Sequence, residues 1–256
     1  MASTALLELR GVSKRFGAVQ ALTSIDFETH KGEVVALVGD NGAGKSTLIK
    51  IISGILPIDE GKILWEGREV SLNGPQAAAA LGIATVYQDL ALCDNLDVVG
   101  NLFLGREKAP GPGWLDEIGM EREAAELLRR LAVSIPSARI QVASLSGGQR
   151  QSIAVARSMM GSPRTVLLDE PTAALGVAQT RQVLDLIRRL REQGLGVVVI
   201  SHNLRDVFSV ADRIVVLRLG KRVATFQVAQ AREVDVVAAI TGLSTEGGAG
   251  IPEARA

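Results

Sequence analysis

The sequence predicts an α/β fold in which helices cover both faces of a mainly parallel β-sheet. The first observation is the β-branched run 34–38, which ends in a glycine-rich loop and leads into a stretch with a helical pattern. The second is the segment 165–217, where short apolar runs alternate with helical patterns. Strands that alternate with helices in this way are typical of a parallel sheet with crossover connections.

Strand-like runs separated by turn residues fill the N-terminal part of the chain. The predicted strands there are 6–11, 18–28, 34–38, 63–65 and 83–87. Pro75 follows Asn73-Gly74 and stands where the first turn of a helix tolerates proline, which predicts a short alanine-rich helix through Leu81.

The character of the chain changes between about residues 90 and 160. Leu127, Leu128 and Leu131 lie on one side of a helical pattern over 121–131, and the proline- and glycine-rich run 109–114 predicts a loop. A second helix is predicted over 150–160.

The alternating pattern then returns and continues almost to the end. The predicted elements are strand 165–168, helix 177–193, strand 196–200, helix 204–210, strand 213–217, a hairpin turn at 219–222, strand 223–226 and helix 233–240. We expect a single domain over residues 5–243 and a flexible tail of small and polar residues over 244–256.

Composition argues against several classes of function. Lys plus Arg and Asp plus Glu number 28 each, and aromatic residues make up 3% of the 256 residues. Balanced charge argues against binding to nucleic acid through phosphate neutralisation, and scarce aromatics argue against a stacking platform for single strands. We therefore expect no nucleic-acid partner.

Membrane insertion and disulfide formation are not expected either. No apolar run approaches the roughly eighteen residues that a spanning helix needs, and the first ten residues do not resemble a signal peptide. The single Cys93 cannot form an intramolecular disulfide, which fits a reducing compartment. We expect a protein that is soluble or attached to a membrane only through a partner.

The loop after strand 34–38 carries the strongest functional signal. It reads Gly39-Asp40-Asn41-Gly42-Ala43-Gly44-Lys45-Ser46-Thr47 and fits the pattern G-x-x-x-x-G-K-[ST] between a strand and a helix. Backbone N–H groups of such a loop turn inward on phosphate, Lys45 would reach the β and γ phosphates, and the Ser46 hydroxyl would ligate Mg²⁺. An ordinary glycine-rich turn is the alternative, but strand, spacing and helix together favour a nucleoside triphosphate.

Two acids end the predicted strand 165–168. Asp169 and Glu170 would lie at the carboxyl edge of the sheet, where α/β proteins bind ligands. Asp169 suits the Mg²⁺ ion, and Glu170 suits a general base that polarises the attacking water. A solvated strand end would look the same, but the phosphate loop upstream favours the catalytic interpretation.

A second helix start has the composition of an anion site. Ser146, Gly147, Gly148 and Gln149 precede the predicted helix 150–160; Ser146 can cap it, and the glycines permit close backbone approach. A simply capped helix is the alternative, and the residue types alone do not decide between the two.

The chain resembles the ATP-binding-cassette (ABC) ATPases over nearly its whole length. Leu145-Ser-Gly-Gly-Gln149 matches the signature of that family, Gln88 matches its Q-loop glutamine, which contacts Mg²⁺ or water, and His202 matches its switch histidine at the γ-phosphate. Phe16 is similar to the aromatic residue that stacks on adenine. Taken alone, Gln88 would be interpreted as a surface residue, His202 as a structural histidine and Phe16 as a hydrophobic residue at the end of a strand.

The resemblance also implies an architecture and an assembly. The expected fold is a P-loop ABC ATPase with a mainly parallel core, an N-terminal antiparallel β subdomain and an inserted helical subdomain at about 90–160. Two such subunits pair head to tail, so that the signature helix of one completes the ATP site of the other. ATP and Mg²⁺ are the expected cofactors, and a second ATP-binding subunit, here in a homodimer, is the expected partner.

A finer resemblance is to the ATPases of monosaccharide importers of the ribose, xylose and fructose type. Segments 85–92, 101–106 and 171–177 carry it. It implies transmembrane permease subunits, indirect contact with an extracytoplasmic solute-binding protein, and a peripheral position at the cytoplasmic face of the inner membrane. Two features depart from the pattern: Gly176 stands where many ABC proteins have aspartate, and many sugar relatives fuse two cassettes.

Two other functions stay open at this point. One is the cassette of a different importer, for instance for branched-chain amino acids. The other is a soluble ABC ATPase that acts on ribosomes or DNA, against which the charge balance and the single cassette argue.

Overall fold

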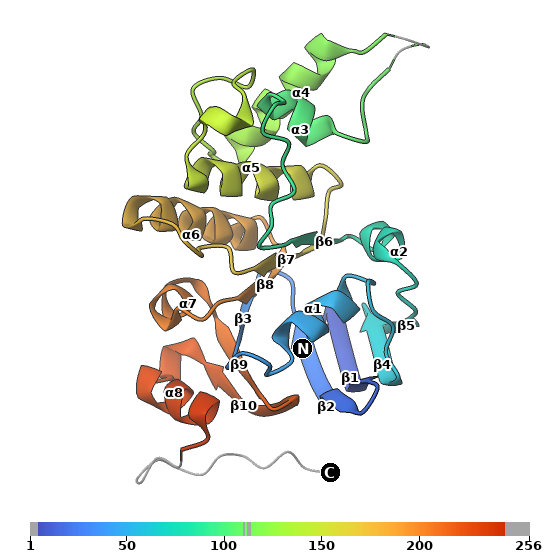
Figure 1. The fold of residues 1–256 in the computed structure, drawn as a ribbon, viewed down its shortest axis with the longest axis vertical. Coiled ribbons are helices and arrows are strands. Elements are labelled where there is room, and N and C mark those ends of the chain that lie inside the picture. Colours follow the sequence, from blue (N-terminus) through green and yellow to red (C-terminus); the bar gives the residue numbers. More distant parts are fainter. Residues whose placement is uncertain (1–4, 110, 112–113, 244–256) are drawn as a thin grey trace.

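The computed structural model describes residues 5–109, 111 and 114–243, and its centre is a six-stranded sheet in the order β10-β9-β3-β8-β7-β6 (Figure 1). Every neighbouring pair is parallel except β9 and β10. The strands are β3 (Val34–Val38), β6 (Ile83–Val86), β7 (Thr165–Asp169), β8 (Gly196–Ile200), β9 (Arg213–Arg218) and β10 (Lys221–Gln227).

Helices cover both faces of this sheet, as predicted. Every residue of β3 is buried, and successive side chains point to opposite faces. Val34, Ala36 and Val38 belong to the hydrophobic cluster on one face, and Val35 and Leu37 belong to the cluster on the other. The first face is covered by α5 (Gly147–Met159), α6 (Val177–Glu192), α7 (Leu204–Val210) and α8 (Glu233–Thr241), and the second by α1 (Lys45–Ile52).

An antiparallel sheet of four strands packs on the α1 side (Figure 1). Its order is β2-β1-β4-β5. The strands are β1 (Leu7–Phe16), β2 (Val19–Thr29), β4 (Glu60–Trp65) and β5 (Arg68–Val70), and the short helix α2 (Pro75–Ala80) follows. Its apolar residues share one core with α1, so this sheet is fixed beside the loop that precedes that helix.

Three departures from the predicted elements have local causes. Helix α4 (Glu117–Arg130) begins four residues before the predicted start, because the Asp116 side chain caps it by accepting the Gly119 N–H at 2.9 Å. Helix α3 (Val98–Phe103) and strand β5 were not predicted, since both are too short to show a period. Part of the predicted loop 109–114 and the whole predicted tail 244–256 lie outside the described residues.

One buried amide organises the chain between β6 and α3. The Asn101 side chain is fully buried; it accepts the Cys93 N–H at 2.7 Å and donates to the carbonyls of Cys93, Leu96 and Asp97 at 2.9, 3.3 and 3.0 Å. The same three carbonyls also accept backbone N–H groups, those of Leu96, Val142 and Asn101. The side-chain hydrogen bonds of Asn101 add to these and hold the segment 93–97 in one conformation.

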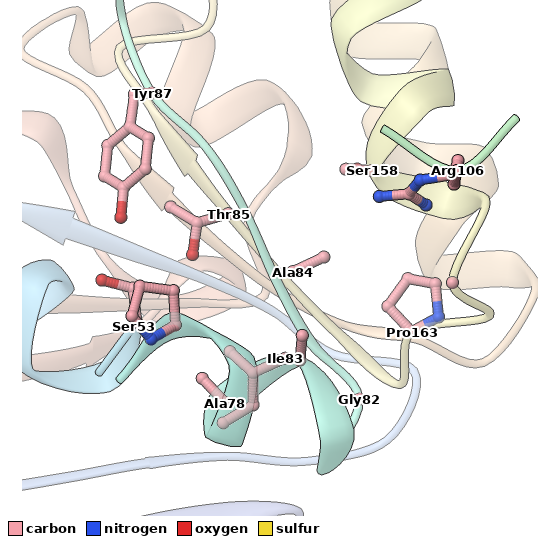
Figure 2. Close-up of a pocket in the computed structure, with 13 residues that line it drawn as sticks. Ser53, Ala78, Gly82, Ile83, Ala84, Thr85, Tyr87, Arg106, Ser158 and Pro163 are labelled. Atoms are coloured by element: carbon pink, nitrogen blue, oxygen red, sulfur yellow. The ribbon is translucent and has the colours of Figure 1, made fainter. Parts of the chain in front are cut away.

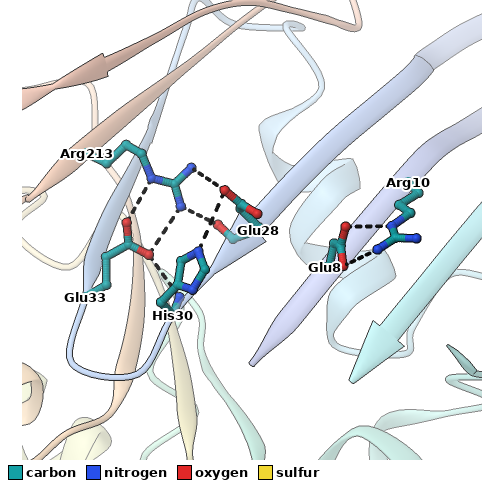
Figure 3. Close-up of polar contacts among 6 residues, drawn as sticks. All are labelled: Glu8, Arg10, Glu28, His30, Glu33 and Arg213. Atoms are coloured by element: carbon teal, nitrogen blue, oxygen red, sulfur yellow. Dashed lines mark hydrogen bonds and ion pairs between the residues drawn. The ribbon is translucent and has the colours of Figure 1, made fainter. Parts of the chain in front are cut away.

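A nearly buried arginine joins the two sheets (Figure 3). Arg213 of β9 donates Nε–H to Glu33 Oε1 at 2.8 Å and an Nη2–H to the Glu28 carbonyl of β2, also at 2.8 Å. Its side chain is 8% exposed and that of Glu33 is 16% exposed. Removing the cation would leave Glu33 largely buried and without its charged partner.

We therefore expect Arg213→Met to lower the free energy of unfolding by about 3–5 kcal/mol, the cost of breaking a buried ion pair. Urea denaturation measures the change. Arg10→Met is the matched control, because the Glu8–Arg10 pair in Figure 3 is solvent-exposed and should leave the denaturation midpoint unaltered. Equal midpoints for both variants would contradict the assignment of Arg213 as the joint between the sheets.

None of the helices within the described ranges 5–109 and 114–243 combines the length and the apolar character needed to cross a bilayer.

Candidate nucleotide site

The strand order gathers most of the predicted site residues at one edge of the large sheet. Parallel strands end at the same edge, and β3, β8, β7 and β6 are successive neighbours there. The phosphate loop follows β3, His202 follows β8, Asp169 and Glu170 end β7, and Gln88 follows β6. Segments more than a hundred residues apart in the chain therefore meet along this edge.

The loop 39–44 requires glycine at two positions. Gly39 has φ 148°, and a Cβ there would lie 2.1 Å from the Leu217 carbonyl oxygen. Gly44 caps α1 with φ 104°, and a Cβ there would lie 2.6 Å from Leu22 Cδ2. Only glycine adopts these torsions within such close packing, so the loop lies tight against β9 and β2. Its backbone leads directly into the positive end of α1.

Lys45 points back across the loop that it follows. Its Nζ donates to the carbonyl oxygens of Gly39 and Asp40 at 2.6 and 2.9 Å. Partial burial lowers the pKa of Lys45, and the carboxylates of Glu170, Asp40 and Asp169 oppose that shift. The ammonium thus lies at the mouth of the loop, where phosphate oxygens would be stronger acceptors than these neutral carbonyls.

The two acids and the histidine form a connected group. Glu170 Oε2 lies 2.8 Å from His202 Nδ1; the glutamate side chain is 17% exposed and the imidazole 74% exposed. Glu170 has φ 51°, an uncommon value for a residue with a side chain, and its N–H donates to the Ile200 carbonyl at 3.0 Å. Burial, and next the charge of Glu170, raise the pKa of the neighbouring Asp169.

The donor set fits a magnesium ion that arrives with the nucleotide. Ser46 is the second residue of α1, and Gln88 is exposed. Burial raises the pKa of the half-buried Asp169 carboxylate, the charges of Lys45 and Lys50 oppose that shift, and within the described residues this carboxylate forms no salt bridge. Within the described ranges no three acidic, histidine or cysteine side chains gather as a metal cage. Few protein ligands are what Mg²⁺ needs when phosphates and water complete its octahedron. The residues present therefore fit nucleotide-bound Mg²⁺.

Phe16 ends β1 beside the phosphate loop. The two-residue turn 17–18 joins β1 to β2, and Phe16 pairs with Val19; the two residues are 46% and 65% exposed. The hairpin is anchored near the loop, since the Ala21 carbonyl oxygen would lie 2.9 Å from a Cβ at Gly44. An exposed aromatic ring at this place can stack on a base.

The Ser146–Gln149 segment is not brought to the phosphate loop within the chain. It starts α5, which packs on the opposite face of the sheet from α1 (Figure 1). In the described part of the chain no hydrogen bond or ion pair joins it to residues 39–47. Ser146 Oγ accepts the Gln149 N–H at 3.3 Å, and Gln149 Oε1 accepts the Ser146 N–H at 3.0 Å, so the segment is a capping box.

The glycines of this segment have a packing role. A Cβ at Gly148 would lie 2.8 Å from Gln179 Cβ, and one at Gly147 would lie 3.0 Å from Leu175 Cδ2. Both neighbours belong to the stretch that follows Glu170 and enters α6. The start of α5 is thereby coupled by direct contact to the chain that carries the predicted general base.

The sequence did not predict one group of residues near the site, formed by Lys14, Phe16 and Asp59. Lys14 Nζ lies 5.8 Å from the centroid of the Phe16 ring and 2.6 Å from Asp59 Oδ1. The spacing of Lys14 and Phe16 in a strand, two residues apart and hence on one face, could have indicated the contact. The part played by Asp59 had no local signal, because it comes from the turn before β4.

The fold and the site define a P-loop nucleotide-binding protein of the triphosphate-hydrolysing class. A family model described as "ABC transporter" matches residues 22–173, which is more than half of the chain. The chain therefore belongs to the ABC transporter family and is an ATPase that binds ATP, which confirms the predicted family and fold class.

Relatives with assigned functions are similar over most of the chain. A xylose/arabinose import ATP-binding protein of Sulfolobus acidocaldarius is 52% identical over 84% of this chain and 86% of its own length. A fructose import ATP-binding protein of Rhizobium meliloti is 46% identical over 94% and 96%. A ribose import ATP-binding protein of Rubrobacter xylanophilus is 44% identical over 94% of this chain, which spans 48% of that relative.

Solved structures agree on the fold. The ADP conformation of an ATP-binding cassette of an ABC transporter superposes with a TM-score of 0.80 at 25% identity, covering 93% of this chain and 96% of that one. A dimeric post-hydrolysis cassette bound to ADP and Pi has a TM-score of 0.71 at 26% identity, covering 87% and 98%.

Proposed function

We propose that this chain is the ATP-hydrolysing subunit of a membrane importer for a monosaccharide such as xylose, fructose or ribose. The observation that carries the proposal is its identity of 44–52% to ATP-binding proteins named for import of these sugars, over 84–94% of the chain. A branched-chain amino acid importer or a non-transport ATPase is the alternative, and the same similarity argues against both.

In this proposal the chain holds one ATP at the carboxyl edge of the sheet. Backbone N–H groups of residues 39–44 and the Lys45 ammonium bind the phosphates, and the start of α1 adds its partial positive charge. Ser46, Asp169 and Gln88 would hold Mg²⁺, which when bound neutralises charge on the phosphate oxygens. Thr47 continues the helix behind the loop, and Phe16 stacks on the adenine.

Hydrolysis depends on the Glu170–His202 pair. The Glu170 carboxylate accepts a proton from the attacking water and so acts as general base. His202 is 2.8 Å from it and mostly exposed, so the imidazole can orient Glu170 and still turn toward the γ-phosphate. The uncommon backbone torsion of Glu170 directs its carboxylate toward this group.

The site is completed by a second copy of the chain. Residues Ser146–Gln149 lie on the other face of the sheet and leave the nucleotide of their own chain uncontacted, whereas a head-to-tail homodimer would place them over the nucleotide of the partner. A related cassette forms a dimer in its ADP- and Pi-bound state. ATP binding would close such a dimer, and hydrolysis would reopen it.

A cavity beside Gln88 is where we place contact with the permease (Figure 2). Its volume is about 250 Å³, and it lies between the strand that leads to Gln88, helix α2 and the end of α5. Among its lining residues are Tyr87, Arg106 and Ser158. Asn101 holds the segment between Gln88 and Arg106, so that closure of the ATP site can move the wall of the cavity.

The proposal also specifies the domain organisation of the subunit, its location in the cell and its partners. The subunit is a single domain over 5–243 with a helical subdomain at about 90–160, peripheral at the cytoplasmic face of the inner membrane. Its direct partners are a second ATP-binding subunit and transmembrane permease subunits, its indirect partner is an extracytoplasmic solute-binding protein, and nucleic acid is no partner.

Ser146→Arg is expected to abolish ATP hydrolysis while the isolated subunit still binds ATP. An arginine at this cap would project over the nucleotide of the partner subunit and block closure, but it leaves residues 39–47 untouched. ATPase assays and equilibrium binding measure the two effects. Ser144→Arg, at an exposed position just before the segment, is the control. Full activity of Ser146→Arg as a monomer would refute the composite site.

A pull-down from native membranes tests the function as a whole. Tagged Glu170→Gln with ATP should retain a multi-span permease, identified by mass spectrometry, and the same bait without ATP serves as the control for nucleotide dependence. Recovery of ribosomal or DNA-repair proteins without any permease would overturn the importer proposal and leave the family assignment standing.

A further inference from the structure

We propose that Lys14 is a positioning residue for the nucleotide: held by Asp59, its ammonium packs on one face of the Phe16 ring and fixes that ring for the adenine base. This inference rests on the proposed function, because Phe16 is a base platform only in a site that binds ATP.

Lys14 is unusual among the lysines near the site in being almost buried. It lies in β1 with 7% of its surface exposed, and its Nζ is 2.6 Å from Asp59 Oδ1. The same ammonium lies 5.8 Å from the centroid of the Phe16 ring. Burying a cation is costly unless it is paired, and Asp59 supplies the pairing while the electron-rich ring face adds to it.

Asp59 also fixes the backbone on the way to Phe16. Its Oδ2 accepts the Arg15 N–H at 2.7 Å, and its own N–H donates to the Ser13 carbonyl at 3.0 Å. The hydrogen bond from Lys14 and then that from Arg15 lower the pKa of Asp59, so this carboxyl is anionic at neutral pH. One carboxylate thus holds both the Lys14 cation and the strand end that presents the ring.

The arrangement suits ligand binding because the ring is constrained on one side and open on the other. Phe16 is 46% exposed although it is aromatic, and Val19 beside it is 65% exposed. A purely structural ion pair would not need an exposed ring next to it. A ring held in one orientation loses less conformational freedom when a base stacks on it, and this increases affinity.

The test compares binding of two ligands to the full chain. Lys14→Met should weaken ATP binding about three- to tenfold, the range that corresponds to a partly desolvated cation–π contact. Affinity for inorganic tripolyphosphate, which has no base, should not change. Asp59→Asn should act in the same direction, and Lys14→Arg should restore most of the ATP affinity because it keeps the cation. Calorimetry measures the affinity of each of the three variants for each of the two ligands.

The control is Lys62→Met, which removes an exposed lysine paired with Glu69 in the same sheet. An equal loss of affinity for ATP and tripolyphosphate in Lys14→Met would make Lys14 structural and overturn the proposal, and so would unchanged ATP affinity. If Lys14→Met does not fold, the affinities of Asp59→Asn for ATP and for tripolyphosphate are compared instead.

Phe16→Ala distinguishes the role of Lys14 from the role of Phe16 as the platform for the base. If it weakens ATP binding and Lys14→Met does not, only the role of Lys14 is wrong. If Phe16→Ala leaves ATP affinity unaltered, Phe16 is not the base platform, and this part of the proposed function falls together with Lys14. If both variants weaken ATP binding, the double variant should lose less than the sum of the single losses, since the two side chains act as a unit.

Discussion

Glu170→Gln is expected to bind ATP normally and to hydrolyse it about 10²–10⁴ times more slowly, the range for loss of a general base. The amide keeps the size of the side chain and its place beside His202, but it cannot accept a proton from water. The expected defect is therefore in turnover alone, with the phosphate loop and Lys45 unaffected. Steady-state hydrolysis and equilibrium ATP binding measure the two quantities separately.

The control for Glu170→Gln is Glu126→Gln, the same chemical change on the exposed surface of α4. It should hydrolyse ATP at the wild-type rate. Normal turnover in Glu170→Gln would remove this residue from the role of general base, and a loss of ATP affinity equal to the loss of turnover would make it a binding residue instead.

Lys45→Ala should weaken ATP binding about 10- to 100-fold, because it removes charge-assisted hydrogen bonds to the phosphates. The methyl group that remains stays within the helical region, so α1 should still form. Binding of ATP to the isolated subunit, followed by calorimetry, gives the loss directly. The expected defect differs from that of Glu170→Gln, which should bind ATP normally and hydrolyse it slowly.

Lys50→Ala is the matched variant in the same helix, since its side chain is exposed at the last turn of α1. ATP affinity close to that of the wild type is expected there. Unchanged affinity in Lys45→Ala itself would contradict the placement of the phosphates on residues 39–47.

The sequence predicted the local elements that carry the candidate site better than their arrangement. The strand, loop and helix around residues 39–47 and the strand that ends at Asp169 were predictable, because each depends on a short local pattern. The strand order β3-β8-β7-β6 was not predictable, because packing between segments far apart in the chain determines which strands are neighbours in a sheet. The contact between Glu170 and His202 follows from that order.

At the start of α5, residue types alone could not decide between an anion-binding site and a simply capped helix. Ser146 and Gln149 form a capping box, as the structural interpretation requires, while Gly147 and Gly148 are needed for contact with Leu175 and Gln179. Both contacts come from a segment about thirty residues further along the chain. No local pattern could have indicated them, and the same holds for Asp59 beneath Lys14.

The most direct test of the composite ATP site is the mass of Glu170→Gln in solution with and without ATP, measured by analytical ultracentrifugation. We expect the 27.0 kDa chain to double its mass when ATP binds, because in the proposed dimer ATP would join the phosphate loop of one copy to the Ser146–Gln149 segment of the other. Adding Ser146→Arg should prevent the doubling. A subunit that is saturated with ATP and stays monomeric, or a doubling that Ser146→Arg leaves intact, would contradict the account.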